Sequence, residues 1–251
     1  MKAIILAAGE GKRLRPLTND RPKCMVEYNK KPIIDYILEV MKECSIDNIA
    51  IVNGYKKDIL SAYLDTKGIT TYTNINYDKT NMVSTLFCAE EFMNDDLIIS
   101  YADIIYTKEI LKKLIVSDDD FSVVVDKEWK ELWQIRMDNP LDDAETLKIE
   151  NGKIIEIGKV PHSYNEIDGQ YIGLIKISKK VINEVIAFYK NLNRDDMYDG
   201  KDFNNMYMTS FIQLIIDFLI DAKPVIVEGG WIEVDTLSDL SAYEDKKWEN
   251  Y

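Results

Sequence analysis

Apolar and polar positions along the first 120 residues predict strands and helices in alternation. The short apolar run from Lys2 to Leu6 ends in Ala-Ala-Gly, which is typical of a buried parallel strand that leads into a loop. After Pro32, apolar residues recur at helical spacing as far as Cys44. Asn48 to Val52 then predicts a second strand, and Lys57 to Leu64 predicts a second helix. This order favours a doubly wound, mostly parallel sheet.

Beyond about residue 121 the apolar runs become shorter and predict several more strands. Asn151-Gly152 lies between two of these runs and is a strong hairpin signal. Two helices are expected, from Lys179 to Asn191 and from Tyr207 to Asp221, and the polar segment from Asn193 to Asn205 is expected to form a loop or lid. The strands expected in this part of the chain are Phe121 to Val125, Trp133 to Met137, Leu147 to Glu150, Lys153 to Ile157, Tyr171 to Ile177, Val225 to Val227 and Trp231 to Val234.

Length and composition agree with one large domain. Hydrophobic residues make up 46% of the 251 residues, which is enough to bury a sizeable core. No repeat, low-complexity tract or linker divides the sequence. We therefore predict one α/β domain over residues 1–251, with a mixed, mostly parallel sheet flanked by helices.

The charge balance limits the partners. Lys and Arg total 31 against 44 Asp and Glu, so the net charge of −13 repels phosphate backbones and anionic membranes. Nucleic acid and membranes are therefore not expected as partners, and an anionic ligand needs a local cluster of cations. Three scattered cysteines without C-x-x-C spacing fit neither a disulfide framework nor a zinc site. Because the N-terminal apolar run is too short for a signal peptide, we expect a cytoplasmic protein.

The segment after the first strand predicts the required anion site. The small residues Ala7, Ala8, Gly9 and Gly11 let the backbone approach a ligand, and their N–H groups are suited to line a phosphate. Neither a Walker loop nor a dinucleotide fingerprint fits the spacing of these glycines. A basic surface loop is the alternative, but it would not explain why cations, glycines and prolines occur together. Five cations fall within twelve residues: Lys12, Arg13, Arg15, Arg21 and Lys23.

This segment resembles the signature G-x-G-x-R-(L)-x-P-L-T-x-x-x-P-K of the sugar-phosphate nucleotidyltransferase superfamily. The resemblance implies a Rossmann-like fold of the nucleotide-diphospho-sugar transferase type, with Gly9 and Gly11 against the nucleotide. It also implies that Arg13 holds the β- and γ-phosphates and that Lys23 reaches the α-phosphate and the acceptor phosphate. Lys12 would belong to the same loop, although surface solvation explains it equally well. The matching positions are Gly9, Gly11, Arg13, Leu14, Pro16, Leu17, Thr18, Pro22 and Lys23.

The resemblance also asks for two metal-binding aspartates, and Asp103 and Asp235 fill these positions. Each follows an apolar run, so both are expected at the carboxyl edge of the sheet, where open α/β folds bind ligands. Two carboxylates together with phosphate oxygens make an ordinary Mg²⁺ site. The alternative is that each aspartate caps a helix or closes a turn, as the run after Asp235 would allow.

Two further segments are candidates for contact with the base. Asn53 and Gly54 follow the second strand, where relatives contact the base. Asn81 and Ser84 resemble the Asn-x-x-Ser segment of cytidylyltransferases, and these residue types hydrogen-bond a pyrimidine edge. A helix capped at its start in this segment is an equally good interpretation and is compatible with the first.

Acceptor-binding candidates come from the second half of the chain. Lys159 falls where sugar-type relatives carry the lysine of a Glu-Lys-Pro motif, and Lys176 is its rival. Tyr171 lies in a segment that resembles the branch with small acceptors, although Glu is expected there in place of Gln170. Trp129 is a candidate for cation–π contact with an ammonium group, with core packing as the alternative.

The resemblance is closest to the cytidylyltransferase branch. It implies transfer of CMP from CTP to a small phosphorylated acceptor, for modification of a cell-surface polysaccharide. The acceptor would be a phospho-amino acid such as phosphoglutamine, phosphocholine or a phosphonate, and pyrophosphate would be released. Residues 1–120 would form the nucleotide-binding half, and residues 121–251 would form an acceptor-binding half that completes the metal site. A homodimer is left open.

Three alternatives remain. A sugar-1-phosphate nucleotidyltransferase that uses UTP, dTTP or GTP would carry a fuller Glu-Lys-Pro motif than the segment around Lys159. A non-catalytic nucleotide-binding regulatory domain would have no need of the basic loop and both aspartates. A glycosyltransferase of similar fold would use an Asp-x-Asp motif. Asp118-Asp119-Asp120 fits that string, but its place before a strand favours a solvated turn.

Overall fold

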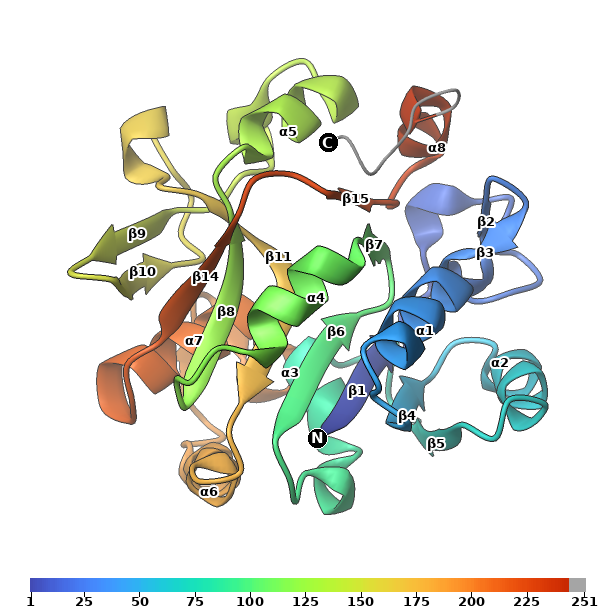
Figure 1. Cartoon of the computed structure of the whole chain (residues 1–251), viewed down its shortest axis with the longest axis horizontal. Helices are drawn as coiled ribbons and strands as arrows, with labels where there is room; N and C mark the ends of the chain where they lie inside the picture. The colour runs from blue at the N-terminus through green and yellow to red at the C-terminus, as the bar shows by residue number, and fades with distance from the viewer. Residues whose placement is uncertain (244–251) are drawn as a thin grey trace.

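A seven-stranded sheet forms the centre of the computed structural model, which describes residues 1–243 (Figure 1). β11 alone runs against its neighbours: it pairs antiparallel with β6 and β8, while the other strand pairs of this sheet are parallel. The predicted mixed, mostly parallel sheet is confirmed. In spatial order its strands are β14 (Lys223–Val227), β8 (Phe121–Asp126), β11 (Gln170–Ile177), β6 (Leu97–Tyr101), β1 (Lys2–Ala7), β4 (Asn48–Asn53) and β5 (Thr70–Thr73).

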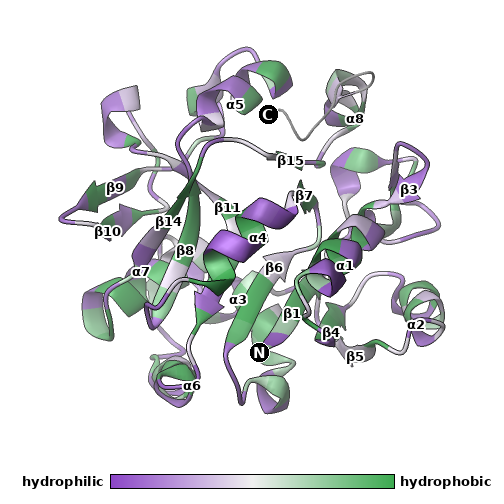
Figure 2. Ribbon diagram, in the orientation of Figure 1, coloured by the Kyte–Doolittle hydropathy of each residue, from purple (hydrophilic) through white to green (hydrophobic). Residues whose placement is uncertain are grey.

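Helices cover both faces of this sheet, because its strands carry apolar side chains on both sides. In β1, Ile5 packs into one core cluster and Ile4 into the other, as the alternation of side chains along a strand requires. Figure 2 shows the strands as apolar and the outer helix surfaces as more polar. The first cluster includes residues of α1 (Ile33–Glu43), α2 (Lys57–Asp65), α4 (Lys108–Ile115), α5 (Trp129–Arg136) and α8 (Leu237–Tyr243). The second includes residues of α3 (Met82–Phe87), α6 (Ile182–Asn191) and α7 (Met208–Phe218).

Short antiparallel pairs extend the domain beyond the main sheet. The Asn151-Gly152 hairpin is confirmed, and it joins β9 (Leu147–Glu150) to β10 (Lys153–Ile157). The remaining pairs are β7 (Ile104–Tyr106) with β15 (Trp231–Glu233), β2 (Glu27–Tyr28) with β3 (Lys31–Pro32), and β12 (Met197–Tyr198) with β13 (Lys201–Asp202).

The predicted strand from Trp133 to Met137 is wrong, because this segment belongs to helix α5. Trp129, Leu132 and Trp133 are all buried, and their i, i+3, i+4 spacing places them on one helical face. The alternation at 133–137 is a fragment of this helical pattern, and a short window does not distinguish the two periods.

The segment from Asn193 to Asn205, expected as a loop or lid, holds the hairpin β12–β13 and a short 3-10 turn. It is attached to α3, since the Asn204 carbonyl accepts hydrogen bonds from the Asn81 backbone and the Ser84 hydroxyl. Among residues 1–243, no helix has the length and apolar character needed to cross a membrane.

Candidate active site

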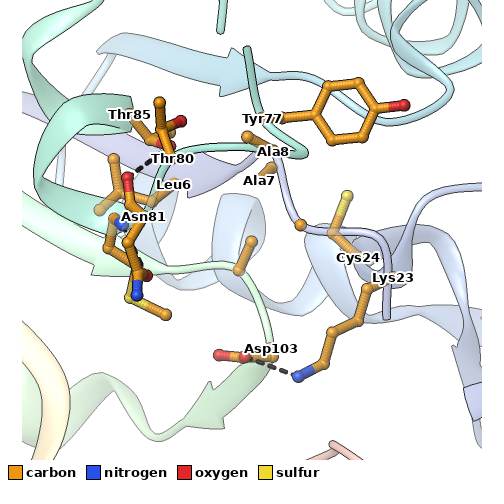
Figure 3. Close-up of a pocket in the computed structure, with 13 residues that line it drawn as sticks. Leu6, Ala7, Ala8, Lys23, Cys24, Tyr77, Thr80, Asn81, Thr85 and Asp103 are labelled. Atoms are coloured by element: carbon orange, nitrogen blue, oxygen red, sulfur yellow. Dashed lines mark hydrogen bonds and ion pairs between the residues drawn. The ribbon is translucent and has the colours of Figure 1, made fainter. Parts of the chain in front are cut away.

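A pocket opens at the carboxyl ends of β1 and β6, and we call it the first pocket. Leu6 and the Ala7-Ala8-Gly9 turn line one side of this pocket. Asp103 and Lys23 lie together on another side (Figure 3). The edge position follows from the parallel register of β1 and β6, in which both chains leave the sheet at the same end. Its lining residues are Leu6, Ala7, Ala8, Gly9, Lys23, Cys24, Tyr77, Thr80, Asn81, Met82, Thr85, Ala102 and Asp103.

The basic loop is folded so that Lys23 returns to the edge of the sheet. Gly11 has φ +63, and a Cβ added there would lie 2.9 Å from the Lys23 Cβ atom. The Thr18 hydroxyl donates a 2.9 Å hydrogen bond to the Gly11 carbonyl and closes the loop. The positive φ angle and the close contact with Lys23 therefore both require a glycine at position 11. Gly11 packs against Lys23 and does not line the first pocket.

Lys23 joins the two predicted metal aspartates. Its Nζ atom lies 2.7 Å from Asp103 Oδ2 and 2.6 Å from Asp235 Oδ1. All three side chains are only 12–14% exposed, so their interaction is little screened by water. Arg13 pairs with the second oxygen of Asp235 and remains 64% exposed. The structure thus brings together the four charged residues to which the motif assigns catalysis and metal binding.

The donor set at this cluster fits a hard divalent cation. Asp103 Oδ1 is buried without a hydrogen-bond partner, which leaves one carboxylate oxygen available for a further ligand. Within residues 1–243 no third His, Cys, Asp or Glu joins the two aspartates in a metal-binding group. Phosphate oxygens or waters would therefore have to supply the remaining ligands, as is usual for Mg²⁺.

Asp235 is not a helix cap, so that alternative is excluded. Thr236 takes the capping role instead: its Oγ1 atom accepts a 3.1 Å hydrogen bond from the Asp239 backbone N–H. Asp239 Oδ2 in turn accepts 2.8 Å hydrogen bonds from the backbone N–H groups of Asp235 and Thr236. Arg136, whose side chain is 3% exposed, pairs with Asp239 at 3.2 Å and with Glu233 at 2.6 Å. This buried network of Arg136, Asp239 and Glu233 fixes the backbone position of Asp235. The charged residues of α5 and α8 did not reveal this network in the sequence.

Two predicted base-contacting side chains serve the structure instead, which corrects their assignment. Asn53 is fully buried, donates to Ser61 at 2.9 Å and accepts from Thr73 at 2.8 Å. Ser84 donates to the Asn204 carbonyl at 2.8 Å and does not line the first pocket. Asn81 does line it, and its side chain also caps α3 by accepting from the Met82 backbone, as the helix interpretation predicted.

Gly54 supports the first pocket from outside. A Cβ atom added to it would lie 2.6 Å from the Tyr77 Cβ atom and 2.9 Å from the Cβ and carbonyl oxygen of Ala8. Both neighbours line the first pocket. The glycine therefore permits the loops after β1 and β4 to touch.

Replacement of Gly54 by Ala is expected to raise the KM for the nucleotide several-fold and to lower the free energy of unfolding by about 1–3 kcal/mol, as overpacking does. The contacts involve Cβ and backbone atoms that do not rotate away, so the Ala8 loop must shift. Steady-state kinetics and thermal unfolding measure the two effects, and the KM for the second substrate is the internal control. An unchanged nucleotide KM would contradict the supporting role of Gly54.

A second pocket adjoins the first and shares Asn81 and Met82 with it. Tyr171, a predicted acceptor-binding residue, lines this pocket. The remaining lining combines aromatic, aliphatic, acidic and amide side chains from β6, β7, α3, α5, β11, α7, β15 and the segments between them. The full lining is Asn81, Met82, Tyr101, Ile104, Trp133, Asp143, Glu145, Gln170, Tyr171, Ile172, Gly173, Tyr207, Met208, Thr209, Trp231 and Glu233.

Three predicted acceptor residues do not reach the second pocket. Lys159 is 59% exposed and pairs with Glu156 at 2.7 Å. Lys176 is buried, and its ammonium donates to the carbonyl groups of Ile115 and Ser117 at the end of α4. Trp129 packs in the core, as the alternative interpretation held, while Trp133, one turn further on, lines the pocket.

Lys12 lies at the surface, and residues that the sequence did not predict also line the two pockets. Lys12 is 73% exposed, pairs with Glu10 at 3.2 Å and lies outside the first pocket, so surface solvation is the better interpretation. Tyr77 and Thr80 line the first pocket from the turn after β5, where the sequence pattern is polar and gave no distinctive signal. Asp143 and Glu145 reach the second pocket from a polar segment that looked like an ordinary loop.

Comparison with known proteins gives consistent matches. Residues 2–131 match the family described as Nucleotidyl transferase. The chain is 53% identical over 253 residues to the CTP:phosphoglutamine cytidylyltransferase of Campylobacter jejuni subsp. jejuni serotype O:2, with 98% of this chain and 100% of that protein covered. It is 37% identical over 123 residues to the choline-phosphate cytidylyltransferase of Streptococcus pneumoniae, with 49% and 53% covered.

Solved structures match the fold over nearly the whole chain. A CTP:phosphocholine cytidylyltransferase from Streptococcus pneumoniae superimposes with a TM-score of 0.71 at 22% identity and 97% coverage of both chains. An inositol-1-phosphate CTP transferase from T. maritima gives a TM-score of 0.74 at 20% identity, with 98% and 97% covered. At these identities the structural matches establish the fold alone.

Proposed function

Because this chain belongs to the nucleotidyl transferase family, we propose that it transfers CMP from CTP to a small phosphorylated acceptor and releases pyrophosphate. The observation that carries the proposal is the position of Lys23, Asp103 and Asp235 between two adjoining pockets. Asp103 lines the first pocket, and the next residue, Ile104, lines the second. Glu233 lines the second pocket and precedes Asp235 by two residues. The charged cluster therefore lies where two bound phosphates would meet.

The first pocket suits a nucleoside. Thr80, Asn81 and Thr85 line one side, where their hydroxyl and amide groups already make hydrogen bonds within the protein. The small side chains of Ala7 and Ala8 leave room for a flat base on another side (Figure 3). The preference for cytosine rests on the likeness to CTP-dependent relatives.

The reaction follows from the charges at the cluster. An oxygen of the acceptor phosphate attacks the α-phosphorus of CTP, the bond from that phosphorus to the bridging oxygen breaks, and pyrophosphate leaves with the electron pair. No general base is required, because a phosphate monoester with a second pKa near 6 is largely a dianion at neutral pH. Lys23 turns from the aspartates to the α-phosphate, and Arg13 neutralises the leaving pyrophosphate.

We further propose that Asp103 and Asp235 hold Mg²⁺ when substrate is present. The unpartnered Oδ1 atom of Asp103 and the two adjacent carboxylates support this assignment. The cation would supply charge neutralisation at the phosphates. The proposal also includes action in the cytoplasm and modification of a cell-surface polysaccharide, both of which rest on the resemblance to cytidylyltransferases.

A pyrophosphate-release panel tests the function. The four NTPs are crossed with phosphocholine, a phosphonate, a phospho-amino acid and glucose 1-phosphate, with Mg²⁺ present. We expect turnover with CTP and a small phosphorylated acceptor to exceed every other combination by at least about 10²-fold. Turnover of the sugar phosphate with UTP, dTTP or GTP, and none with CTP, would instead support a sugar-1-phosphate nucleotidyltransferase. Nucleotide binding without any turnover would support a regulatory domain.

A further inference from the structure

The hydroxyl groups of Thr80 and Thr85 lie on one wall of the first pocket (Figure 3). One buried side chain joins them: the Asn74 amide donates a 2.9 Å hydrogen bond to each hydroxyl oxygen, and Asn74 is only 3% exposed. Asn74 follows β5, and its backbone N–H donates at 2.8 Å to the Asn53 carbonyl at the end of β4. The edge of the sheet therefore fixes the position of this amide.

The orientation of the Asn74 amide follows from its backbone partner. A backbone N–H can only donate, and that of Asn76 donates to Asn74 Oδ1 at 3.0 Å. The amide oxygen is therefore on the side of Asn76, and the amide nitrogen is on the side of the two threonines. Both N–H bonds of this nitrogen are used, one by each hydroxyl.

The single proton of each threonine hydroxyl is also used within the protein. Thr80 donates it to the Asn76 carbonyl at 3.0 Å. Thr85 donates it to the Asn81 carbonyl at 3.2 Å. A hydroxyl group has one proton and two lone pairs, and the Asn74 amide occupies one of these lone pairs. Each hydroxyl therefore has one lone pair left for a ligand and no proton.

This wall can distinguish cytosine from uracil, which differ at position 4 of the ring. Cytosine carries an amino group there, which donates to a lone pair, whereas uracil carries a carbonyl oxygen, which only accepts. A carbonyl oxygen against the two hydroxyls would lose its hydrogen bonds with water and gain none. Asn81 lines the same pocket, but its side-chain amide lies apart from the two threonine hydroxyls (Figure 3).

We propose that Asn74 sets the base preference of the first pocket by holding Thr80 and Thr85 as hydrogen-bond acceptors for the 4-amino group of a pyrimidine. The inference rests on the proposed function, since it takes the first pocket as the nucleotide site. It deepens that function, because it derives the preference for cytosine from the direction of hydrogen bonds. Asn74 does not line the pocket, so it is a positioning residue that acts through the two threonines.

The test measures nucleotide binding by titration calorimetry with Mg²⁺ and without an acceptor, so that it does not depend on turnover. The ligands are CTP, UTP and the triphosphate of pyrimidin-2-one riboside, which carries only hydrogen at position 4 and otherwise keeps the cytosine ring. The wild type should bind CTP about 2–10-fold more tightly than the pyrimidin-2-one nucleotide, which is the range of one hydrogen bond. It should bind CTP at least about 10²-fold more tightly than UTP.

Three variants locate the effect. Asn74→Ala leaves each threonine with one hydrogen bond in place of two, so its side chain can turn and donate to a carbonyl oxygen. The ratio of the CTP and UTP affinities should therefore fall by about 10-fold. Thr80→Val and Thr85→Val each remove one acceptor with little change of shape, and they should lower the affinity for CTP and leave that for UTP unchanged or higher. Thr66→Val is the matched control, since that exposed hydroxyl also donates to a backbone carbonyl and lines neither pocket.

Thermal unfolding shows whether each variant is folded, and the threonine variants decide the matter if Asn74→Ala is not. A ratio near one in the wild type, or the wild-type ratio in a folded Asn74→Ala or in both threonine variants, would overturn the proposal. The expected ratios without conversion of any acceptor by CTP would leave it standing and remove the proposed reaction. Turnover with CTP but the wild-type ratio in every variant would have the reverse meaning.

Discussion

Replacement of Asp103 or Asp235 by Asn is expected to lower Mg²⁺-dependent turnover on the order of 10²–10³-fold. Each carboxylate lies within hydrogen-bond distance of Lys23, and Asn keeps the shape while it removes the charge. An amide oxygen is a weaker ligand for a hard cation than a carboxylate oxygen. The loss should therefore appear in catalysis and in the concentration of Mg²⁺ that gives half-maximal turnover.

The fold of both variants should survive. Lys23 keeps one carboxylate partner in either case, and the Asp239 carboxylate still accepts a hydrogen bond from the backbone N–H of Asp235. Thermal unfolding and circular dichroism check this point. Asp20→Asn is the matched control, because that carboxylate is 72% exposed and, among residues 1–243, forms an ion pair with its neighbour Arg21 alone. Turnover equal to the wild type in D103N and D235N would reject the carboxylate assignment.

Replacement of Lys23 by Met is expected to have two effects of opposite direction. Turnover should fall on the order of 10²–10³-fold, because the ammonium group proposed to stabilise the α-phosphate during transfer is lost. In contrast, Mg²⁺ should bind more tightly in the absence of nucleotide. In the free protein the ammonium group pairs with both aspartates and, together with Arg13, balances their two negative charges, so its removal leaves the pair with one uncompensated negative charge.

Kinetics and titration calorimetry with Mg²⁺ alone measure these two effects. Met retains the length of the lysine stem, so the 13% exposed side chain continues to fill its place against the loop. Lys148→Met is the control, since Lys148 lies on β9 and is 40% exposed. A variant that loses activity without a gain in Mg²⁺ affinity would show that Lys23 does not compete with the cation for the aspartates.

Competition between Lys23 and the cation is expected to weaken binding of the cation to the two aspartates when no nucleotide is present. In the free protein Lys23 and Arg13 together balance the two negative charges of the aspartate pair, so a divalent cation gains little by replacing Lys23. A triphosphate draws Lys23 and Arg13 away and adds its own oxygens as ligands. Binding of nucleotide and cation is therefore expected to be mutually reinforcing.

The sequence by itself determined the parts of the protein that depend on local pattern. The run from Lys2 to Leu6 and the helical spacing after Pro32 identified elements that the structure contains, because burial on both sheet faces leaves a continuous apolar run and burial of one helix face leaves a period of 3.6. The long basic motif predicted Arg13 and Lys23, and the resemblance predicted Asp103 and Asp235. The rule that parallel strands end at one edge accounts for the place of Asp103 after β6, whereas Asp235 comes from β15, which pairs antiparallel with β7 outside the main sheet.

Only the tertiary structure decided which polar side chains face a pocket and which are used internally. Asn53 and Lys176 looked like ligand-binding residues, yet backbone and side-chain partners far along the chain satisfy them. Glu145 carries no distinctive sequence signal. In the structure its backbone N–H donates a hydrogen bond to Gln170, 25 positions away, and both residues line the second pocket. The sequence shows the same residue type whether its side chain binds a ligand or hydrogen-bonds another part of the protein. Its role is set by the partners that folding brings within about 3 Å, and no local pattern records them.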